Sequence, residues 1–350
     1  MKTIVSIQVL RGIAVSMVVL YHTYAVQQKY FGSNQLPDIF SLGFWGVDIF
    51  FVVSGFVMYK SVYRQRSKDS PLSFLMARVT RIYPAYWVVT LVIFAAAQFS
   101  PTLINSSYEG TPSLLRSLLL FPDHTLPWLN VGWSLIYEMW FYLLLFFLLA
   151  LGRRAMPLIL AIYAGLLVAT GGIDDRGPTV ELISDPLVLE FLSGFLIGSV
   201  YFNTEDHRRQ GFLFCISLVA IVPIVHLMGT ASINVPESLE RFSTFGLLAA
   251  SITAVALLID GAIERTRLLQ PVVAIGEASY SIYLTHVIAL NLFYLASSRI
   301  VDIQPPAALM AIFCFGFVAF FGNLYYRCVE TPLTRAAQNL VERSSPSTVP

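Results

Sequence analysis

Two ionisable side chains, Arg11 and His22, interrupt the first long apolar run of the chain. Eleven residues at about 100° per residue bring both side chains onto one helix face, about 16 Å apart along the helix axis. Ionisable groups inside a membrane span are costly, so each is a functional candidate. A histidine in such a place can act as a general base. The alternative interpretation is an anchoring arginine near one membrane surface and an interfacial histidine near the other.

Two carboxylates are expected at a similar depth. Asp48 lies near the start of the second apolar run, GFWGVDIFFVVSGF, where it could hold the imidazole in one tautomer or cap the start of a helix. Glu138 lies in WSLIYEMWFY, four residues after Ser134, so these two side chains share a helix face. The sequence therefore predicts that His22, Asp48 and Glu138 converge on a cavity in the outer half of a helix bundle.

Two further polar stripes complete the set of candidates. Arg78 and Arg81 in RVTRIYPAYW share a helix face, and two guanidinium groups suit phosphate binding. Plain anchoring on the cytoplasmic side is the alternative for them. In SYSIYLTH, Ser279, Tyr283 and His286 follow i, i+4, i+7 spacing and form one stripe. For His286, a hydrogen bond within the core is the alternative.

The composition indicates which elements carry these residues. The 350 residues are 56% hydrophobic and 12% charged, against about 25% charged in a soluble domain, and the mean hydropathy is +0.70. This composition excludes a soluble enzyme, a nucleic-acid binder and a disordered scaffold. Three cysteines without CxxC spacing predict neither a disulfide framework nor a zinc site, and we expect no metal.

The fold class expected is all-α, a polytopic bundle of about ten transmembrane helices. Seventeen of the 22 Lys and Arg residues fall on the cytoplasmic side if both termini are cytoplasmic. We expect a single membrane domain over 1–335 and a short frayed cytoplasmic tail over 336–350. The predicted spans are 4–26, 41–60, 82–99, 131–151, 155–171, 187–202, 211–229, 242–260, 272–297 and 306–327.

Five segments appear in a fixed order: LRGIAVSMVVLYH, GVDIFFVVSGF, RVTRIYPAYW, WSLIYEMWFY and SYSIYLTH. Together they resemble the membrane acyltransferase-3 family, especially bacterial exopolysaccharide O-acetyltransferases, over about residues 5–330. The resemblance implies a ten-span enzyme of the bacterial inner membrane. It also implies transfer of an acetyl group from cytoplasmic acetyl-CoA, used as co-substrate rather than a bound cofactor, to a hydroxyl of a carbohydrate or other acceptor.

The resemblance carries over by position. Arg11 and His22 match its Arg-x10-His motif, with His22 as the implied catalytic residue, and Arg78 and Arg81 match its Arg-x-x-Arg motif on the acyl-CoA side. Many relatives carry an extra extracytoplasmic hydrolase-like domain, which we expect this chain to lack. The expected site comprises catalytic His22, Asp48 and Glu138, donor-binding Arg11, Arg78 and Arg81, and substrate-binding Trp133, Ser134, Tyr283 and His286.

Several alternatives remain open at this stage. Transfer can be direct or pass through an acyl-histidine. The acceptor can be an exopolysaccharide, a lipid-linked sugar, a lipopolysaccharide or a small metabolite, and polysaccharide assembly machinery and membrane lipids are candidate partners. A transporter or proton-coupled carrier is the main competing function, because it would also place Arg, His and Glu inside the membrane. A non-catalytic assembly protein is a third possibility.

Overall fold

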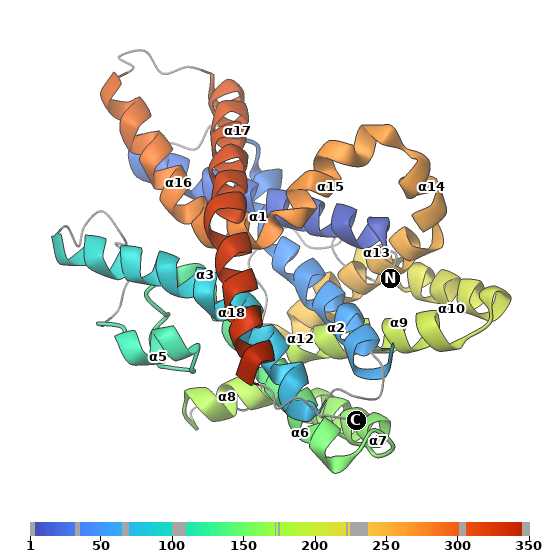
Figure 1. The fold of residues 1–350 in the computed structure, drawn as a ribbon. Helices are drawn as coiled ribbons and strands as arrows, with labels where there is room; N and C mark the ends of the chain where they lie inside the picture. Colours follow the sequence, from blue (N-terminus) through green and yellow to red (C-terminus); the bar gives the residue numbers. More distant parts are fainter. Residues whose placement is uncertain are drawn as a thin grey trace.

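The computed structural model describes residues 4–31, 36–64, 70–99, 110–171, 173, 176–221, 223–224, 237–300 and 306–344. Every regular element within these residues is helical, as expected, and Figure 1 shows how the helices are arranged, with α16 and α17 side by side and α9 beside α2. The helices are α1 Val5–Phe31, α2 Gly46–Arg64, α3 Pro71–Phe99, α5 Leu114–Leu119, α6 Trp133–Leu151, α7 Met156–Thr170, α8 Pro178–Ser184, α9 Val188–Asn203, α10 Asp206–Val219, α12 Ser238–Arg241, α13 Leu247–Leu258, α14 Asp260–Arg265, α15 Gln270–Glu277, α16 Ser279–Ile300, α17 Ala307–Tyr325 and α18 Thr331–Ser344.

Seven helical segments of the described residues are long and apolar enough to cross a membrane, which supports an integral membrane protein. They are Val5–Gln27, Asp38–Tyr63, Pro71–Phe99, Asn130–Leu151, Ser238–Leu258, Ser279–Ser297 and Ala308–Arg343. The other three expected spans coincide with α7, α9 and α10, which have 15, 16 and 14 residues. Helices of that length reach about 21–24 Å, short of a bilayer core of about 30 Å. Part of the expected span 211–229 lies outside the described residues, which omit 222 and 225–236.

The prediction of one continuous span over 272–297 is wrong. The chain forms two helices there, α15 and α16, which are separated at Ala278. The reason is close packing of α15 on α1. A Cβ on Gly12 would lie 2.3 Å from the carbonyl oxygen of Val272, and one on Gly276 would lie 1.9 Å from that of Gln8. This contact holds α15 along the first half of α1 and forces the turn before α16.

A second close helix contact joins α2 and α9. A Cβ on Gly55 would lie 1.9 Å from the carbonyl oxygen of Phe191, and one on Gly194 would lie 1.8 Å from that of Val52. Small residues that let two backbones touch are the usual device for packing helices within a membrane. The contact fixes the rotation of α2, and with it the direction in which the polar side chains of α2 point.

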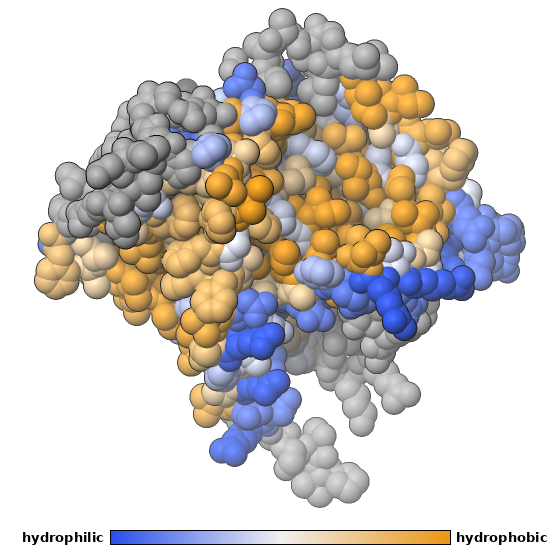
Figure 2. All heavy atoms as spheres, turned by 90° about the horizontal axis from the view of Figure 1, so that it is seen from above, coloured by the Kyte–Doolittle hydropathy of each residue, from blue (hydrophilic) through white to orange (hydrophobic). Residues whose placement is uncertain are grey.

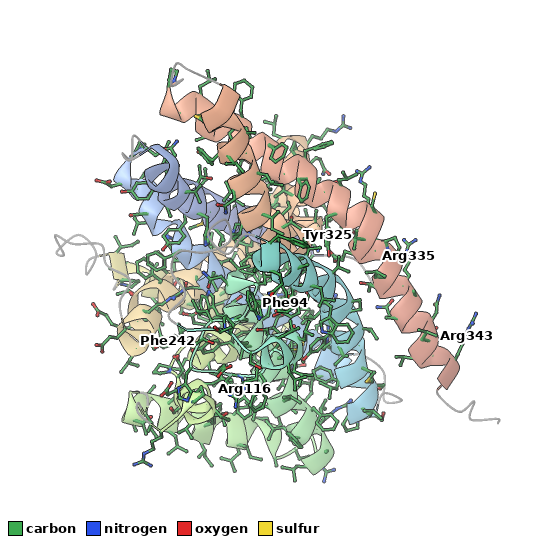
Figure 3. The ribbon with its side chains drawn as sticks, turned by 90° about the vertical axis from the view of Figure 1, so that its left-hand side faces the viewer. Phe94, Arg116, Phe242, Tyr325, Arg335 and Arg343 are labelled. Carbon is green, nitrogen blue, oxygen red and sulfur yellow. The ribbon has the colours of Figure 1, made fainter. Side chains whose placement is uncertain are left out.

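The outer surface suits a lipid environment. Large apolar side chains are exposed over much of it, and Figure 2 shows broad hydrophobic areas with hydrophilic residues gathered mainly at the lower centre and the right-hand edge. Helices α17 and α18 continue one another through a π-helical turn at Tyr326–Glu330, and Arg335 and Arg343 lie along the far part of this rod (Figure 3). Residues 336–344 are therefore helical where the sequence suggested a frayed tail, and residues 345–350 lie outside the described residues.

Candidate functional site

An elongated cavity of about 290 Å³ lies inside the bundle. Along α2 its lining extends from Val47 to Lys60, which corresponds to about 20 Å of helix. Its walls come from the first half of α1, from α2, from the first half of α3, and from the starts of α6 and α16. Helices far apart in the sequence therefore bring the candidate polar residues to one internal space.

The cavity is strongly cationic. Four basic side chains line it, Arg11, Arg78, Arg81 and Lys60, and Glu138 is the carboxylate among its lining residues. The Arg78 guanidinium donates a hydrogen bond of 2.6 Å to the Ser61 hydroxyl. Lys60 and Arg78 lie near the C-terminal part of α2, whereas Tyr283 packs against Phe50 near the start of α2, with Ser134 beside it.

Glu138 balances part of this charge. Its Oε1 accepts hydrogen bonds from the Ser54 hydroxyl, at 3.1 Å, and from the Tyr142 hydroxyl. It interacts electrostatically with Arg11 and Arg78. Glu138 thus lies beside the arginines, and its contacts suit holding them in place.

A second carboxylate approaches the arginines from the C-terminal rod. Glu330, in the π-helical turn between α17 and α18, accepts a hydrogen bond from Ser281 and interacts electrostatically with Arg11 and Arg81. Glu330 was not among the predicted site residues, because it lies past the end of an apolar run and no spacing connects it with another motif.

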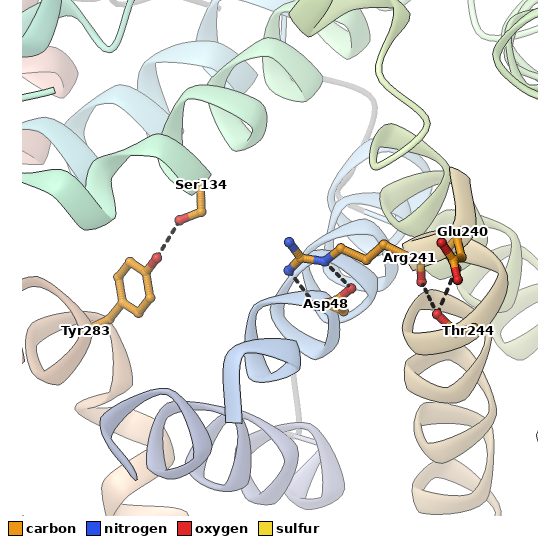
Figure 4. Close-up of polar contacts among 6 residues, drawn as sticks. All are labelled: Asp48, Ser134, Glu240, Arg241, Thr244 and Tyr283. Carbon is orange, nitrogen blue, oxygen red and sulfur yellow. Dashed lines mark hydrogen bonds and ion pairs between the residues drawn. The ribbon is translucent and has the colours of Figure 1, made fainter. Parts of the chain in front are cut away.

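Ser134 and Tyr283 line the cavity away from Lys60 and Arg78, and their hydroxyls face each other (Figure 4). The Ser134 and Tyr283 oxygens are 2.8 Å apart, and Tyr283 also donates to the Val131 carbonyl oxygen at 3.0 Å. The Tyr283 ring lies 5.6 Å from the ring of His286, measured between centroids. Tyr283 therefore lies between the cavity lining and His286.

His22 and His286 form a pair beyond Tyr283. Their ring centroids are 4.7 Å apart, and Nε2 of His286 lies 3.3 Å from Nδ1 of His22. Neither ring is part of the cavity lining, and His286 is fully buried. The sequence analysis named both residues but assigned His286 to substrate contacts and did not anticipate the pair.

Asp48 does not contact His22, which corrects the expected orientation of the imidazole by that carboxylate. Both Asp48 oxygens accept hydrogen bonds from Arg241, at 3.0 Å from Nε and 2.8 Å from Nη2 (Figure 4). Both side chains are buried, and the buried Glu190 interacts with them electrostatically. The Thr244 hydroxyl donates to backbone oxygens of the turn that carries Arg241.

Trp133 belongs to the same neighbourhood as this ion pair. The Arg241 guanidinium lies over its ring, 5.8 Å from the centroid, and over the ring of Phe44 at 5.4 Å. Trp133 does not line the cavity, unlike Ser134 beside it. Arg241 lies one residue before the expected span 242–260 and was not among the predicted site residues. Glu190 was not among them either, although an ionisable residue within an apolar run was the signal that could have found it.

The structure thus divides the expected site into three groups. The cavity holds Arg11, Arg78, Arg81, Glu138, Ser134 and Tyr283. The histidine pair lies directly behind Tyr283. The ion pair of Asp48 and Arg241, with Trp133 beside it, forms the third group.

Comparisons with known proteins give a consistent result. A family model described as an acyltransferase domain matches residues 4–325. The exopolysaccharide production protein ExoZ of Rhizobium meliloti is 29% identical over 303 residues, which cover 85% of this chain and 91% of that protein. The peptidoglycan O-acetyltransferase OatA of Listeria monocytogenes is 26% identical, and the O-acetyltransferase OatA of Staphylococcus aureus is 23% identical. These matches cover 95% and 93% of this chain but 56% of each OatA protein. No solved structure matches the chain.

Proposed function

Since this chain belongs to the acyltransferase family defined by that domain model, we propose that it moves an acetyl group from cytoplasmic acetyl-CoA to a hydroxyl of an exopolysaccharide or another cell-envelope glycan. The observation that carries the proposal is the long cationic cavity, which ends at two hydroxyls with a histidine pair behind them. The names of the ExoZ and OatA relatives support a glycan acceptor. The family match favours this function over a transporter.

The donor would occupy the cavity. Coenzyme A carries a diphosphate and a further phosphate at one end and its thioester at the other. Arg11, Arg78 and Arg81 offer forked donors that match phosphate oxygens, and Lys60 adds a fourth positive charge. A cavity about 20 Å long then suits an extended pantetheine arm that carries the thioester from the arginines toward Ser134 and Tyr283.

The chemistry would take place at the end lined by Ser134 and Tyr283. His22 removes the proton of the acceptor hydroxyl, and the oxygen attacks the thioester carbonyl carbon. The carbon–sulfur bond breaks, and the coenzyme A thiolate leaves and takes the proton from His22. The products are an acetyl ester and free coenzyme A. Ser134 and Tyr283 are proposed to contact the acceptor, and Glu138 to hold the arginines.

The proposal places the arginine end of the cavity on the cytoplasmic side of a bacterial inner membrane, in agreement with the distribution of Lys and Arg. Reporter fusions check this orientation. A fusion near Arg154 should report a cytoplasmic location, and one near Arg176 a periplasmic location. The same comparison applies to positions 66 and 106, which lie outside the described residues. A periplasmic signal at position 66 or 154 would contradict the topology.

Acetyl-CoA consumption by the purified protein in lipid nanodiscs tests the function itself. We expect coenzyme A release that depends on the acceptor glycan, with one ester formed for each coenzyme A released. Failure to consume acetyl-CoA in the presence of the glycan from the producing cell would contradict the proposal. Transport of the glycan or of a proton without ester formation would support the competing carrier.

Arg78→Ala is expected to raise the KM for acetyl-CoA by about 10- to 100-fold, because it removes charge-assisted hydrogen bonds to phosphate. Arg78→Lys should recover part of this loss, since an ammonium keeps the charge but lacks the bidentate fork. Initial rates over a range of acetyl-CoA concentrations provide the measurement. Arg154→Ala is the matched control, because it removes the same charge from an exposed turn outside the cavity. An unchanged KM for Arg78→Ala would exclude Arg78 from donor binding.

A further inference from the structure

The partners of His286 determine which of its ring nitrogens carries the proton. Nδ1 of His286 lies 2.6 Å from the Tyr283 carbonyl oxygen. A carbonyl oxygen can only accept a hydrogen bond, so Nδ1 must be the protonated nitrogen. In a neutral ring, Nε2 then carries a lone pair. That lone pair faces Nδ1 of His22 at 3.3 Å.

The partners of His22 lead to the matching assignment. Nδ1 of His22 lies 2.9 Å from the Val18 carbonyl oxygen, in addition to its contact with His286. Both neighbours are acceptors, so Nδ1 of His22 carries a proton that it donates to them. The other nitrogen, Nε2 of His22, is therefore the one left with a lone pair. A general base needs such a lone pair.

Neither Asp48 nor Glu138, the two carboxylates expected beside His22, accepts the proton of its Nδ1. The Asp48 oxygens accept hydrogen bonds from Arg241, and Glu138 accepts from Ser54 and Tyr142. Within the described part of the chain, neither carboxylate is hydrogen-bonded to His22. His286 is fully buried, which keeps water from competing for Nδ1 of His22 on that side.

We propose that His286 is the positioning residue for the His22 base. It holds His22 in the tautomer with Nδ1 protonated, keeps Nε2 free to take the acceptor proton, and accepts from the Nδ1–H of the imidazolium that forms. The proton that leaves the acceptor hydroxyl stays on Nε2 of His22 and passes to the coenzyme A thiolate. This inference rests on the proposed function, since it assigns a partner to the base of that reaction.

A matched pair of substitutions tests the role. His286→Gln places an amide oxygen where it can accept from Nδ1 of His22, whereas His286→Met has a similar length and fits a buried site but lacks such an acceptor. We expect His286→Met to lower kcat by about 10- to 100-fold with the KM for acetyl-CoA unchanged, because a hydrogen bond to a charged group is lost. His286→Gln should keep most of the kcat.

Two further variants separate positioning from folding. His286→Asn keeps an amide but is too short to reach His22, so we expect it to match His286→Met rather than His286→Gln. Thr285→Val removes a neighbouring buried hydroxyl that bonds to the Ser281 backbone oxygen, and it should keep the wild-type kcat. All rates are expressed per unit of monodisperse protein from size-exclusion chromatography.

The outcomes are distinct. A near-normal kcat for both His286→Met and His286→Asn overturns the inference, and so does an equal loss for His286→Gln and His286→Met. Failure of the proposed function has another signature, because the wild-type protein would then show no glycan-dependent release of coenzyme A. A third outcome is that the wild type and His286→Met are active whereas His22→Ala is inactive. The proposed function would then stand, but His286 would have no part in it.

Discussion

Acyl transfer is expected to fall by about 10²- to 10⁴-fold when His22 is replaced by alanine, which is the usual loss when a general base is removed. The protein should still insert and fold, because His22 bonds to its own helix and to His286 and is only partly buried. The measurement is acetylation of the glycan in cells that lack the native enzyme, with the membrane abundance of each variant quantified.

Thr23→Val is the matched control for His22→Ala. Thr23 is the next residue of the same helix and is buried, and its hydroxyl donates to the Val19 carbonyl oxygen. Loss of the Thr23 hydroxyl tests whether any change in this turn of α1 is sufficient to reduce activity. Near-normal acetylation by His22→Ala at equal abundance would show that His22 is not the base, and His286 would then be the leading candidate.

Asp48→Ala is expected to lower the free energy of unfolding by about 3 kcal/mol, at the low end of the ~3–5 kcal/mol typical of breaking a buried ion pair. The loss arises because Arg241 stays buried after its bidentate partner is removed. Glu190 lies close enough to offset part of it. Thermal unfolding in detergent and the yield of monodisperse protein are the measurements.

A double variant distinguishes a structural from a chemical role of Asp48. Replacing both partners, Asp48→Leu with Arg241→Met, leaves no buried charge unpaired and should recover much of the stability. If Asp48 serves only to hold Arg241 and the start of α2, the double variant should also recover acyl transfer. Recovered folding without recovered transfer would assign Asp48 to the chemistry. Wild-type stability of Asp48→Ala alone would contradict the importance of the ion pair.

The membrane class and the inventory of polar residues were accessible from sequence. Long apolar runs and low charge content require helices in a bilayer, because only structures that satisfy their own backbone can cross it. Helical spacing then placed Arg78 and Arg81 on one face, and both line the cavity. Spacing also placed Ser134 and Glu138 together, and both line the same cavity.

Element lengths and breaks were less accessible. Helices α7, α9 and α10 contain apolar residues throughout much of their length but are shorter than a bilayer core requires. The break between α15 and α16 depends on Gly12 and Gly276, which allow α15 to lie against α1. Hydrophobicity along the chain does not record such a contact, because it arises between segments more than 250 residues apart.

The sequence by itself indicated the membrane environment and the helix face that polar residues such as Ser134 and Glu138 share. The tertiary structure alone decided which residues meet. The sequence predicted that His22 and Asp48 lie at a similar depth and converge. The structure instead pairs His22 with His286 and Asp48 with Arg241. The physical reason is that helical spacing fixes side chains relative to their own axis, whereas the rotation of each helix about that axis is set by contacts with its neighbours. Contacts such as those of Gly55 with Phe191 and of Gly194 with Val52 are visible only once the bundle is assembled.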